Sequence, residues 1–94
     1  MEVQFFYVYI LFSFRDKKLY IGYTENLKIR LGEHFHGKVQ ATTNRRPLIL
    51  IHYEAFTDIR DAKAREKFLK SGVGRSQMKK ALQNKLRELG YQPS

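Results

Sequence analysis

Residues 5–12, Phe-Phe-Tyr-Val-Tyr-Ile-Leu-Phe, constrain the fold more than any other stretch of the chain. Aromatic and β-branched side chains dominate this stretch, which is typical of a strand with both faces at least partly covered. Side chains alternate between the two faces of a strand, so one face is wholly apolar and belongs to the main core. The other face carries Tyr7 and Tyr9. A buried phenol needs a hydrogen-bond partner or water, so this second face is the better candidate for a functional site.

Two further runs predict strands that complete a small sheet. Residues 19–23 follow a short polar connection, so we expect them to pair with residues 5–12 as an antiparallel hairpin. Residues 48–56 are rich in Leu, Ile, Tyr and Phe, and we expect them to form the third and central strand.

A first helix is predicted after the hairpin. Leu27 and Leu31 lie one helical turn apart, and either Thr24 or Asn26 is suited to cap the helix at its start. Residues 36–47 show no clear periodicity, and we expect a loop with at most one helical turn. A loop of that length in a small domain is usually functional or mobile.

Two more helices are predicted in the second half of the chain. The first is expected over residues 59–70, with Thr57 or Asp58 as its cap. The second is expected over about residues 76–89, with Ser76 as its cap and an apolar face that packs on the core.

The chain is strongly basic, with a net charge of +9. A field of that sign favours DNA, RNA or an anionic membrane surface, although a generically basic protein has the same composition. Its 94 residues favour a single domain, and the absence of cysteine excludes disulfides and thiolate metal sites. No apolar run is long enough to span a bilayer, and no signal peptide precedes the first strand, so we expect a cytoplasmic protein.

Glu66 is the most informative single residue. The inward stripe of its predicted helix contains Ile59, Ala62 and Leu69, and Glu66 lies on the same stripe. A carboxylate on an apolar stripe is costly unless it is paired or binds a metal. Glu66 is therefore a candidate metal ligand. The alternatives are a salt bridge to an inward-leaning arginine and a side chain that reaches past the edge of the core.

Cationic side chains accompany the predicted helices. Arg30 and His34 lie one turn apart beside the apolar pair of the first helix, and they are candidates for a phosphate-binding fork and a proton relay. Lys63, Lys67 and Lys70 form a row along the second helix that is suited to contact a phosphate backbone. An ordinary solvated helix face is the alternative in both cases.

Two tyrosine triplets carry a resemblance to a known family. Tyr7-Val8-Tyr9 and Tyr20-Ile21-Gly22, separated by ten residues, resemble the two-part signature of the GIY-YIG nuclease superfamily, with Tyr and Val in place of the first Gly and Ile. Arg30 matches the helix arginine of that family, and His34 matches a histidine that many members carry one turn later. Glu66 matches the metal-binding glutamate. The closest resemblance is to short members that are similar to the nuclease domain of bacterial excision repair.

The resemblance runs from about Phe5 to Lys70 and implies a fold and an activity. The fold is α/β (α+β), a three-stranded antiparallel sheet flanked by helices in one domain over residues 1–94. The activity is that of a metal-dependent endonuclease, which hydrolyses DNA phosphodiester bonds in repair or recombination. In such a site Glu66 would hold one divalent cation, Mg²⁺ or Mn²⁺, which are hard ions suited to oxygen ligands.

The resemblance also implies roles for the other residues of the site. Arg30 would bind phosphate oxygens, and Tyr20 would orient the water or the phosphate. Tyr9 would accept the proton of the attacking water, directly or through a neighbour such as His34. The candidate nucleic-acid contacts are Tyr23, Lys28, Arg45, Arg46, Lys63, Lys67 and Lys70.

Two positions depart from the family pattern. Tyr23 stands where some members have a lysine directly after the second triplet, and Met78 stands where several have an asparagine. A non-catalytic nucleic-acid-binding module with a relic site is therefore the alternative function. The expected partner is DNA, recognised by its backbone or structure, with a second protein as a possible guide and no membrane partner. The oligomeric state and the particular DNA substrate do not follow from the sequence.

Overall fold

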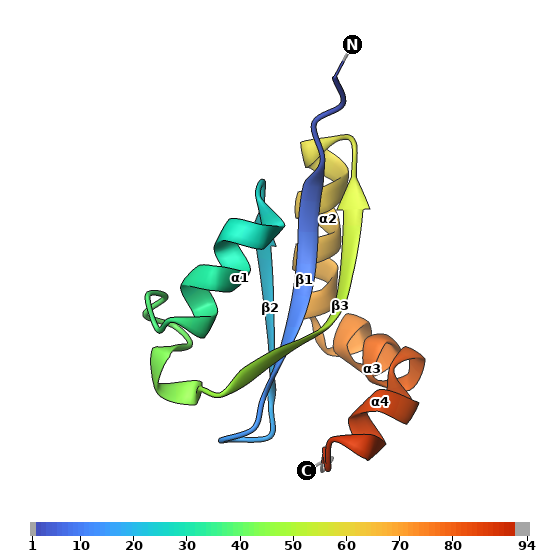
Figure 1. The fold of residues 1–94 in the computed structure, drawn as a ribbon. Coiled ribbons are helices and arrows are strands. Elements are labelled where there is room, and N and C mark those ends of the chain that lie inside the picture. Colours follow the sequence, from blue (N-terminus) through green and yellow to red (C-terminus); the bar gives the residue numbers. More distant parts are fainter. Residues whose placement is uncertain (1, 92–94) are drawn as a thin grey trace.

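The computed structural model describes residues 2–91. Strands β1 (Phe6–Ser13), β2 (Leu19–Thr24) and β3 (Leu48–Phe56) form an antiparallel sheet in the order β2-β1-β3 (Figure 1). The predicted α/β fold is confirmed, including the hairpin of the first two strands. The prediction that the third strand is central is wrong, because β1 holds that place. β1 is apolar or aromatic along most of its length, which suits the strand that is covered on both sides.

Helices fill most of the remaining described chain. They are α1 (Leu27–Phe35), the short 3-10 helix η1 (Thr43–Arg45), α2 (Ile59–Lys70), α3 (Gly72–Ala81) and α4 (Gln83–Glu88). Helices α1 and α2 cover opposite faces of the sheet (Figure 1). Within residues 2–91 no helix has the length and apolar character needed to cross a membrane.

The apolar face of β1 forms the main core, as predicted. Val8, Ile10 and Phe12 are each at most 1% exposed and cluster with Ala62 and Leu69 of α2. The opposite face of β1, which carries Tyr9, turns toward α1. The sheet therefore separates the bulk of the core from the tyrosine face.

Two of the predicted helix caps are present. The side chain of Asn26 accepts a hydrogen bond from the backbone N–H of Ile29 at 3.1 Å, which fixes the start of α1. The side chain of Asp58 accepts one from the backbone N–H of Arg60 at 2.8 Å and starts α2. Each bond satisfies a helical N–H that would otherwise lack a partner.

The C-terminal segment differs from its prediction. Two helices replace the single helix expected over about 76–89, and Ser71 rather than Ser76 caps the first of them. The Ser71 hydroxyl accepts a hydrogen bond from the N–H of Gly74 at 3.1 Å. A Cβ at Gly74 would overlap the carbonyl of Phe68. Because glycine has no side chain, α3 can start directly against the end of α2, where the sequence suggested only a break.

Candidate active site

A glycine on the neighbouring strand makes room for Tyr9. Tyr9 of β1 lies opposite Gly22 of β2 in the sheet register. A Cβ on Gly22 would overlap Cζ and the hydroxyl oxygen of Tyr9, so the phenol ring lies across β2 where a side chain would otherwise stand. Tyr9 is consequently only 1% exposed. The second triplet therefore contributes a space for the tyrosine of the first.

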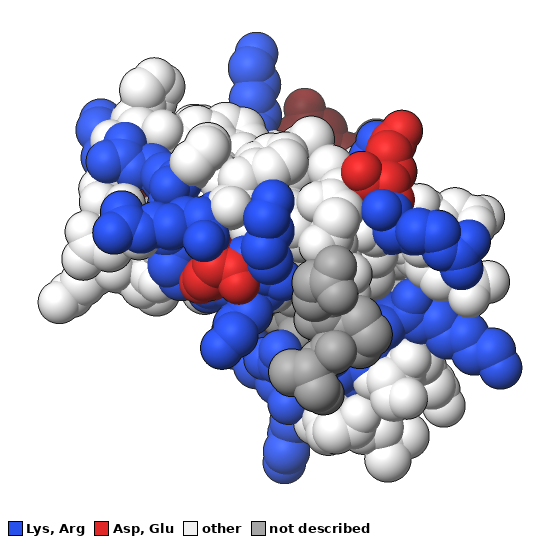
Figure 2. Space-filling model, turned by 90° about the horizontal axis from the view of Figure 1, so that it is seen from below, with Lys and Arg blue, Asp and Glu red and all other residues white. Residues whose placement is uncertain are grey.

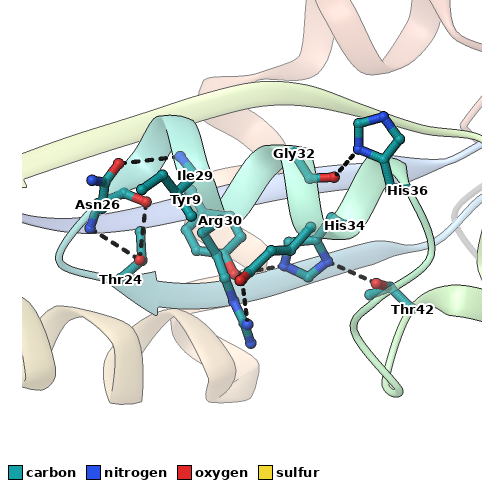
Figure 3. Close-up of polar contacts among 10 residues, drawn as sticks. Tyr9, Thr24, Asn26, Ile29, Arg30, Gly32, His34, His36 and Thr42 are labelled. Carbon is teal, nitrogen blue, oxygen red and sulfur yellow. Dashed lines mark hydrogen bonds and ion pairs between the residues drawn. The ribbon is translucent and has the colours of Figure 1, made fainter.

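A buried hydrogen-bonded chain runs from Tyr9 through α1 to the loop that follows it (Figure 3). The Tyr9 hydroxyl lies 2.7 Å from Nε2 of His34, and Nδ1 of the same ring lies 2.7 Å from Oγ1 of Thr42. His34 and Thr42 are both 0% exposed. The chain is shielded from water, and hydrogen bonds in such a medium are electrostatically stronger than at the surface.

Arg30 favours one direction for these hydrogen bonds. Its guanidinium, which can only donate, lies beside the Tyr9 hydroxyl and acts to lower the pKa of that phenol. A donor on that side favours the arrangement in which the Tyr9 hydroxyl donates its own proton to Nε2 of His34. A neutral imidazole carries one proton, so Nδ1 holds it and donates to the Thr42 hydroxyl.

Burial keeps both ring systems of this chain uncharged. Burial, followed by the nearby charge of Arg30, lowers the pKa of His34 to about 4. Burial also raises the pKa of Tyr9 to about 12, although the hydrogen bond from Arg30 acts in the opposite direction. At neutral pH the two groups are a phenol and a neutral imidazole. Such a pair can position a neighbour or relay a proton but supplies no fixed charge.

The low pKa of His34 predicts a pH-dependent stability. The unfolded state, with a pKa near 6.5, binds the proton more readily than the folded state, so folding loses stability as the pH falls from 6.5 to about 4. Above pH 6.5 the neutral His34 makes its full contribution to the free energy of unfolding. The complete loss of that contribution at low pH amounts to at most about 3 kcal/mol. Urea unfolding across this range should show the decline in wild type and a smaller one in His34→Gln. The matched variant of the exposed His36, His36→Gln, should decline like wild type, and equal declines in all three proteins would refute the assignment.

Tyr20 and Arg30 form the more open part of the site. The centre of the Tyr20 ring lies 5.2 Å from that of His34 and 6.3 Å from that of Tyr9, and Tyr20 is half-buried. The Arg30 side chain is 37% exposed and forms an ion pair with Glu33 at 3.0 Å. Arg30 therefore reaches solvent from a position fixed by a phenol on one side and a carboxylate on the other.

Glu66 belongs to α2, which covers the other face of the sheet, and it lies beside the edge strand β2. Its carboxylate pairs with Lys70 at 2.8 Å and with Lys63 at 3.8 Å. The Lys63 ammonium also lies 3.9 Å from the centre of the Tyr23 ring in β2. After burial and other nearer groups, the charge of Glu66 contributes to the raised pKa of both Tyr9 and Tyr23. Glu66 therefore acts electrostatically on the tyrosine face from across the strand edge.

The surroundings of Glu66 suit a cation with few protein ligands. Within residues 2–91 no group of three His, Cys, Asp or Glu side chains gathers to hold a metal. Mg²⁺ usually keeps several waters and is held by one or two carboxylates and by substrate phosphates. A lone carboxylate that is 17% exposed fits that pattern, with Lys70 as the group that a cation would displace.

The predicted phosphate contacts fall into two groups. Tyr23, Lys63 and Lys70 lie at Glu66, and Lys67 is exposed on the same helix. The other three predicted contacts, Arg45, Arg46 and Lys28, lie away from Glu66.

Arg45, Arg46 and Lys28 lie outside the tyrosine site, which consists of Tyr9, Tyr20, Arg30 and His34. Arg45 pairs with Asp16 at 2.6 Å and donates to the carbonyl of Leu19, so it ties η1 to the turn between β1 and β2. Arg46 donates to a carbonyl within η1 at 3.1 Å. Lys28 lines a separate pocket near the start of α1.

Thr42 and Glu33 are site residues that sequence reasoning missed. Thr42 lies in the segment expected to be a loop, eight residues from His34, and no local pattern links the two. Glu33 did carry a signal, because residues three apart on a helix are neighbours and an acid in that place pairs with Arg30.

Comparison with known proteins identifies the family. The model of the GIY-YIG catalytic domain matches residues 5–81 of the chain. The chain belongs to the GIY-YIG family. This is a family of nucleases that generally use a divalent metal.

Several relatives with similar sequences carry the name UPF0213 protein. A UPF0213 protein of Bacillus licheniformis is 38% identical over 96 residues, covering 100% of this chain and 97% of the relative. One from Streptococcus pyogenes is 42% identical over 72 residues, covering 76% and 77%. One from Pediococcus acidilactici is 39% identical over 77 residues, covering 79% and 78%. No solved structure gives a significant match.

The structure places Met78, which the resemblance sets at the position of an asparagine in several family members, in the core. It is 5% exposed and packs in the cluster that contains Leu69 and Leu86. A thioether in that position contributes packing and no polar group. The polar neighbours of the site are instead Thr42 and Glu33 on the opposite face of the sheet.

Proposed function

We propose that this GIY-YIG protein is a metal-dependent endonuclease that hydrolyses phosphodiester bonds in DNA. The observation that carries the proposal is the presence of two unlike charges beside β2, Arg30 from one face of the sheet and Glu66 from the other. Arginine suits phosphate oxygens, and a carboxylate suits a hard cation. A metal-dependent nuclease needs both groups, whereas a binding module needs only the cation.

Glu66 would hold one Mg²⁺ or Mn²⁺, and the cation would stabilise the charge that develops on the leaving 3′ oxygen. Until substrate arrives, Lys63 and Lys70 hold the carboxylate in place. Their release from Glu66 then provides two ammonium groups beside the DNA phosphates.

The proton of the attacking water would leave through the buried chain. Tyr9 is 1% exposed, so the half-buried Tyr20 is the residue that holds the water at the mouth of the site, where the water can reach the Tyr9 hydroxyl. As the Tyr9 oxygen accepts the proton of that water, Tyr9 passes its own proton to Nε2 of His34. A bound phosphodiester places negative charge next to Arg30, which offsets the repulsion between Arg30 and a protonated His34.

Cleavage of supercoiled plasmid and of flapped and branched DNA tests this function. Nicked or linear products that require Mg²⁺ or Mn²⁺ and vanish with EDTA support it. A small domain that reads backbone and shape suits the branched intermediates of repair or recombination, so we expect these substrates to be cut faster than plain duplex. Salt-sensitive binding without cleavage of any substrate would instead support a binding module with a relic site, the reading favoured by the apolar Met78.

Thr42→Val should slow cleavage while leaving DNA binding unchanged. Valine has the shape of threonine but gives Nδ1 of His34 no acceptor, which costs about 1–3 kcal/mol of stability. The imidazole is then free to change tautomer, and we expect the maximal rate to fall about 10- to 100-fold with KM unchanged. Single-turnover cleavage below the melting temperature measures the effect.

Two further substitutions control for a purely structural effect of Thr42→Val. Thr42→Ser keeps the hydroxyl and should recover most of the rate, whereas the adjacent Thr43→Val should behave as wild type. If the cleavage rates of all three variants differ only in proportion to the fraction of protein that is folded, Thr42 has no positioning role.

A further inference from the structure

A cationic groove lies outside the tyrosine site, between the β1–β2 turn, α3 and the end of the described chain. Its volume is about 500 Å³, and its lining includes Lys17, Lys18, Arg45, Arg75, Lys79 and Tyr91. Among the described lining residues Asp16 is the single acid, and it is already paired with Arg45 at 2.6 Å. The groove therefore concentrates positive charge in a concave surface.

The charge of the groove has little internal compensation. Within residues 2–91 no carboxylate lies within 4.0 Å of the amino or guanidinium groups of Lys17, Lys18, Arg75 or Lys79. Figure 2 shows the end of the molecule where the turn lies, and lysine and arginine side chains cover much of that face with few acids among them. Convergent like charges repel one another, and a polyanion relieves that repulsion on binding.

Parts of the groove are held in place before any ligand binds. Arg45 is fixed by Asp16 and by the Leu19 carbonyl, to which it donates at 3.3 Å. The backbone N–H of Tyr91 donates to the Leu86 carbonyl at 2.9 Å, and the Tyr91 ring centre lies 5.4 Å from the Lys79 ammonium. A preformed wall loses less conformational freedom when it binds.

The groove and the tyrosine site adjoin along β2. Leu19 lines the groove, and the next residue, Tyr20, lies in the tyrosine site on the opposite face of the strand. A strand of nucleic acid that leaves the tyrosine site around the start of β2 therefore meets the groove at once.

We propose that this groove binds the phosphate backbone of DNA flanking the bond that is cleaved. The proposal rests on the function proposed above, because it concerns a second contact to the same substrate. It is tested through binding without metal, so that its outcome does not depend on cleavage.

The test compares two triple variants that lose the same charge. The groove variant is Lys18→Gln, Arg75→Gln and Lys79→Gln, and the control is Lys38→Gln, Arg60→Gln and Lys85→Gln, whose residues do not line the groove. Fluorescence anisotropy of a labelled DNA duplex is measured in EDTA over a series of KCl concentrations, after thermal denaturation has shown that both variants fold.

We expect the groove variant to reduce the slope of log Kd against log salt by about 2 to 3, since each lost phosphate contact removes about 0.9. Its affinity at low salt should fall at least about 10-fold, whereas the control should stay within about 2-fold of wild type. Equal weakening in the two variants would overturn the proposal. So would a larger groove-dependent loss for duplex RNA or anionic lipid vesicles than for DNA.

The two proposals fail in distinguishable ways. If wild type cleaves DNA with metal but the groove variant binds like the control, the nuclease function is supported and the DNA-binding role of the groove is refuted. If wild type cleaves no DNA but the groove variant loses DNA binding, the binding role of the groove is supported and the nuclease function is refuted.

Discussion

Glu66→Gln should abolish metal-dependent cleavage and leave DNA binding intact. Glutamine keeps the size of the side chain, but it lacks the charge that a divalent cation requires. We expect the single-turnover rate to fall about 10²- to 10³-fold, the range seen when a main electrostatic stabiliser of a transition state is lost. Affinity for DNA in EDTA should be unchanged or tighter, because one negative charge has left a surface that faces phosphates.

Glu88→Gln is the matched control for this substitution. It removes the same charge from α4, where Glu88 pairs with Lys85 at 2.6 Å, and it should cleave like wild type. Mn²⁺ binding, followed by electron paramagnetic resonance, gives a readout that is independent of turnover and should weaken in Glu66→Gln alone. Cleavage that survives Glu66→Gln would indicate a contaminating nuclease or a different active site.

Gly22→Ala should damage both the site and the fold. The new Cβ would overlap the Tyr9 ring, which is 1% exposed and held by His34 at 2.7 Å, so the ring cannot move without losing that bond. We expect a loss of about 1–3 kcal/mol in the free energy of unfolding, which is typical of overpacking. Because the displaced hydroxyl no longer holds Arg30, cleavage by the folded fraction should fall about 10²-fold.

Gly32→Ala tests whether the effect belongs to the position or to glycine replacement in general. A Cβ on Gly32 would meet no atom within 4 Å beyond its two chain neighbours and the backbone of its own helix, and the residue lies in the interior of α1. Alanine there should stabilise the protein by about 0.5–1 kcal/mol and leave cleavage unchanged. Urea unfolding and single-turnover cleavage of both variants measure the contrast. A Gly22→Ala protein that matched Gly32→Ala in both would show that the Tyr9 ring does not occupy the space over β2.

Local patterns predicted most of the secondary structure. The alternation in residues 5–12, the run at 48–56 and the bounds of α2 all follow from spacing along the chain. Strand order did not follow, because an apolar run looks the same at the centre of a sheet and at its edge. The helix predicted over about 76–89 failed for a related reason. A glycine that breaks an isolated helix becomes the start of α3 when the end of α2 lies against it.

The tyrosine site divides in the same way. The sequence by itself determined the candidate groups, since two tyrosine triplets, the Arg30–His34 spacing and an acid on an apolar stripe are visible without a fold. Only the tertiary structure decided the burial, the pKa values and the hydrogen-bond partners of these groups. It buried Tyr9 over Gly22 and so raised the pKa of the phenol. It also brought Thr42 into hydrogen-bond distance of His34, although the segment that carries Thr42 shows no sequence pattern. Charge, burial and proton position depend on what surrounds a side chain, and those surroundings come from residues that are distant in sequence.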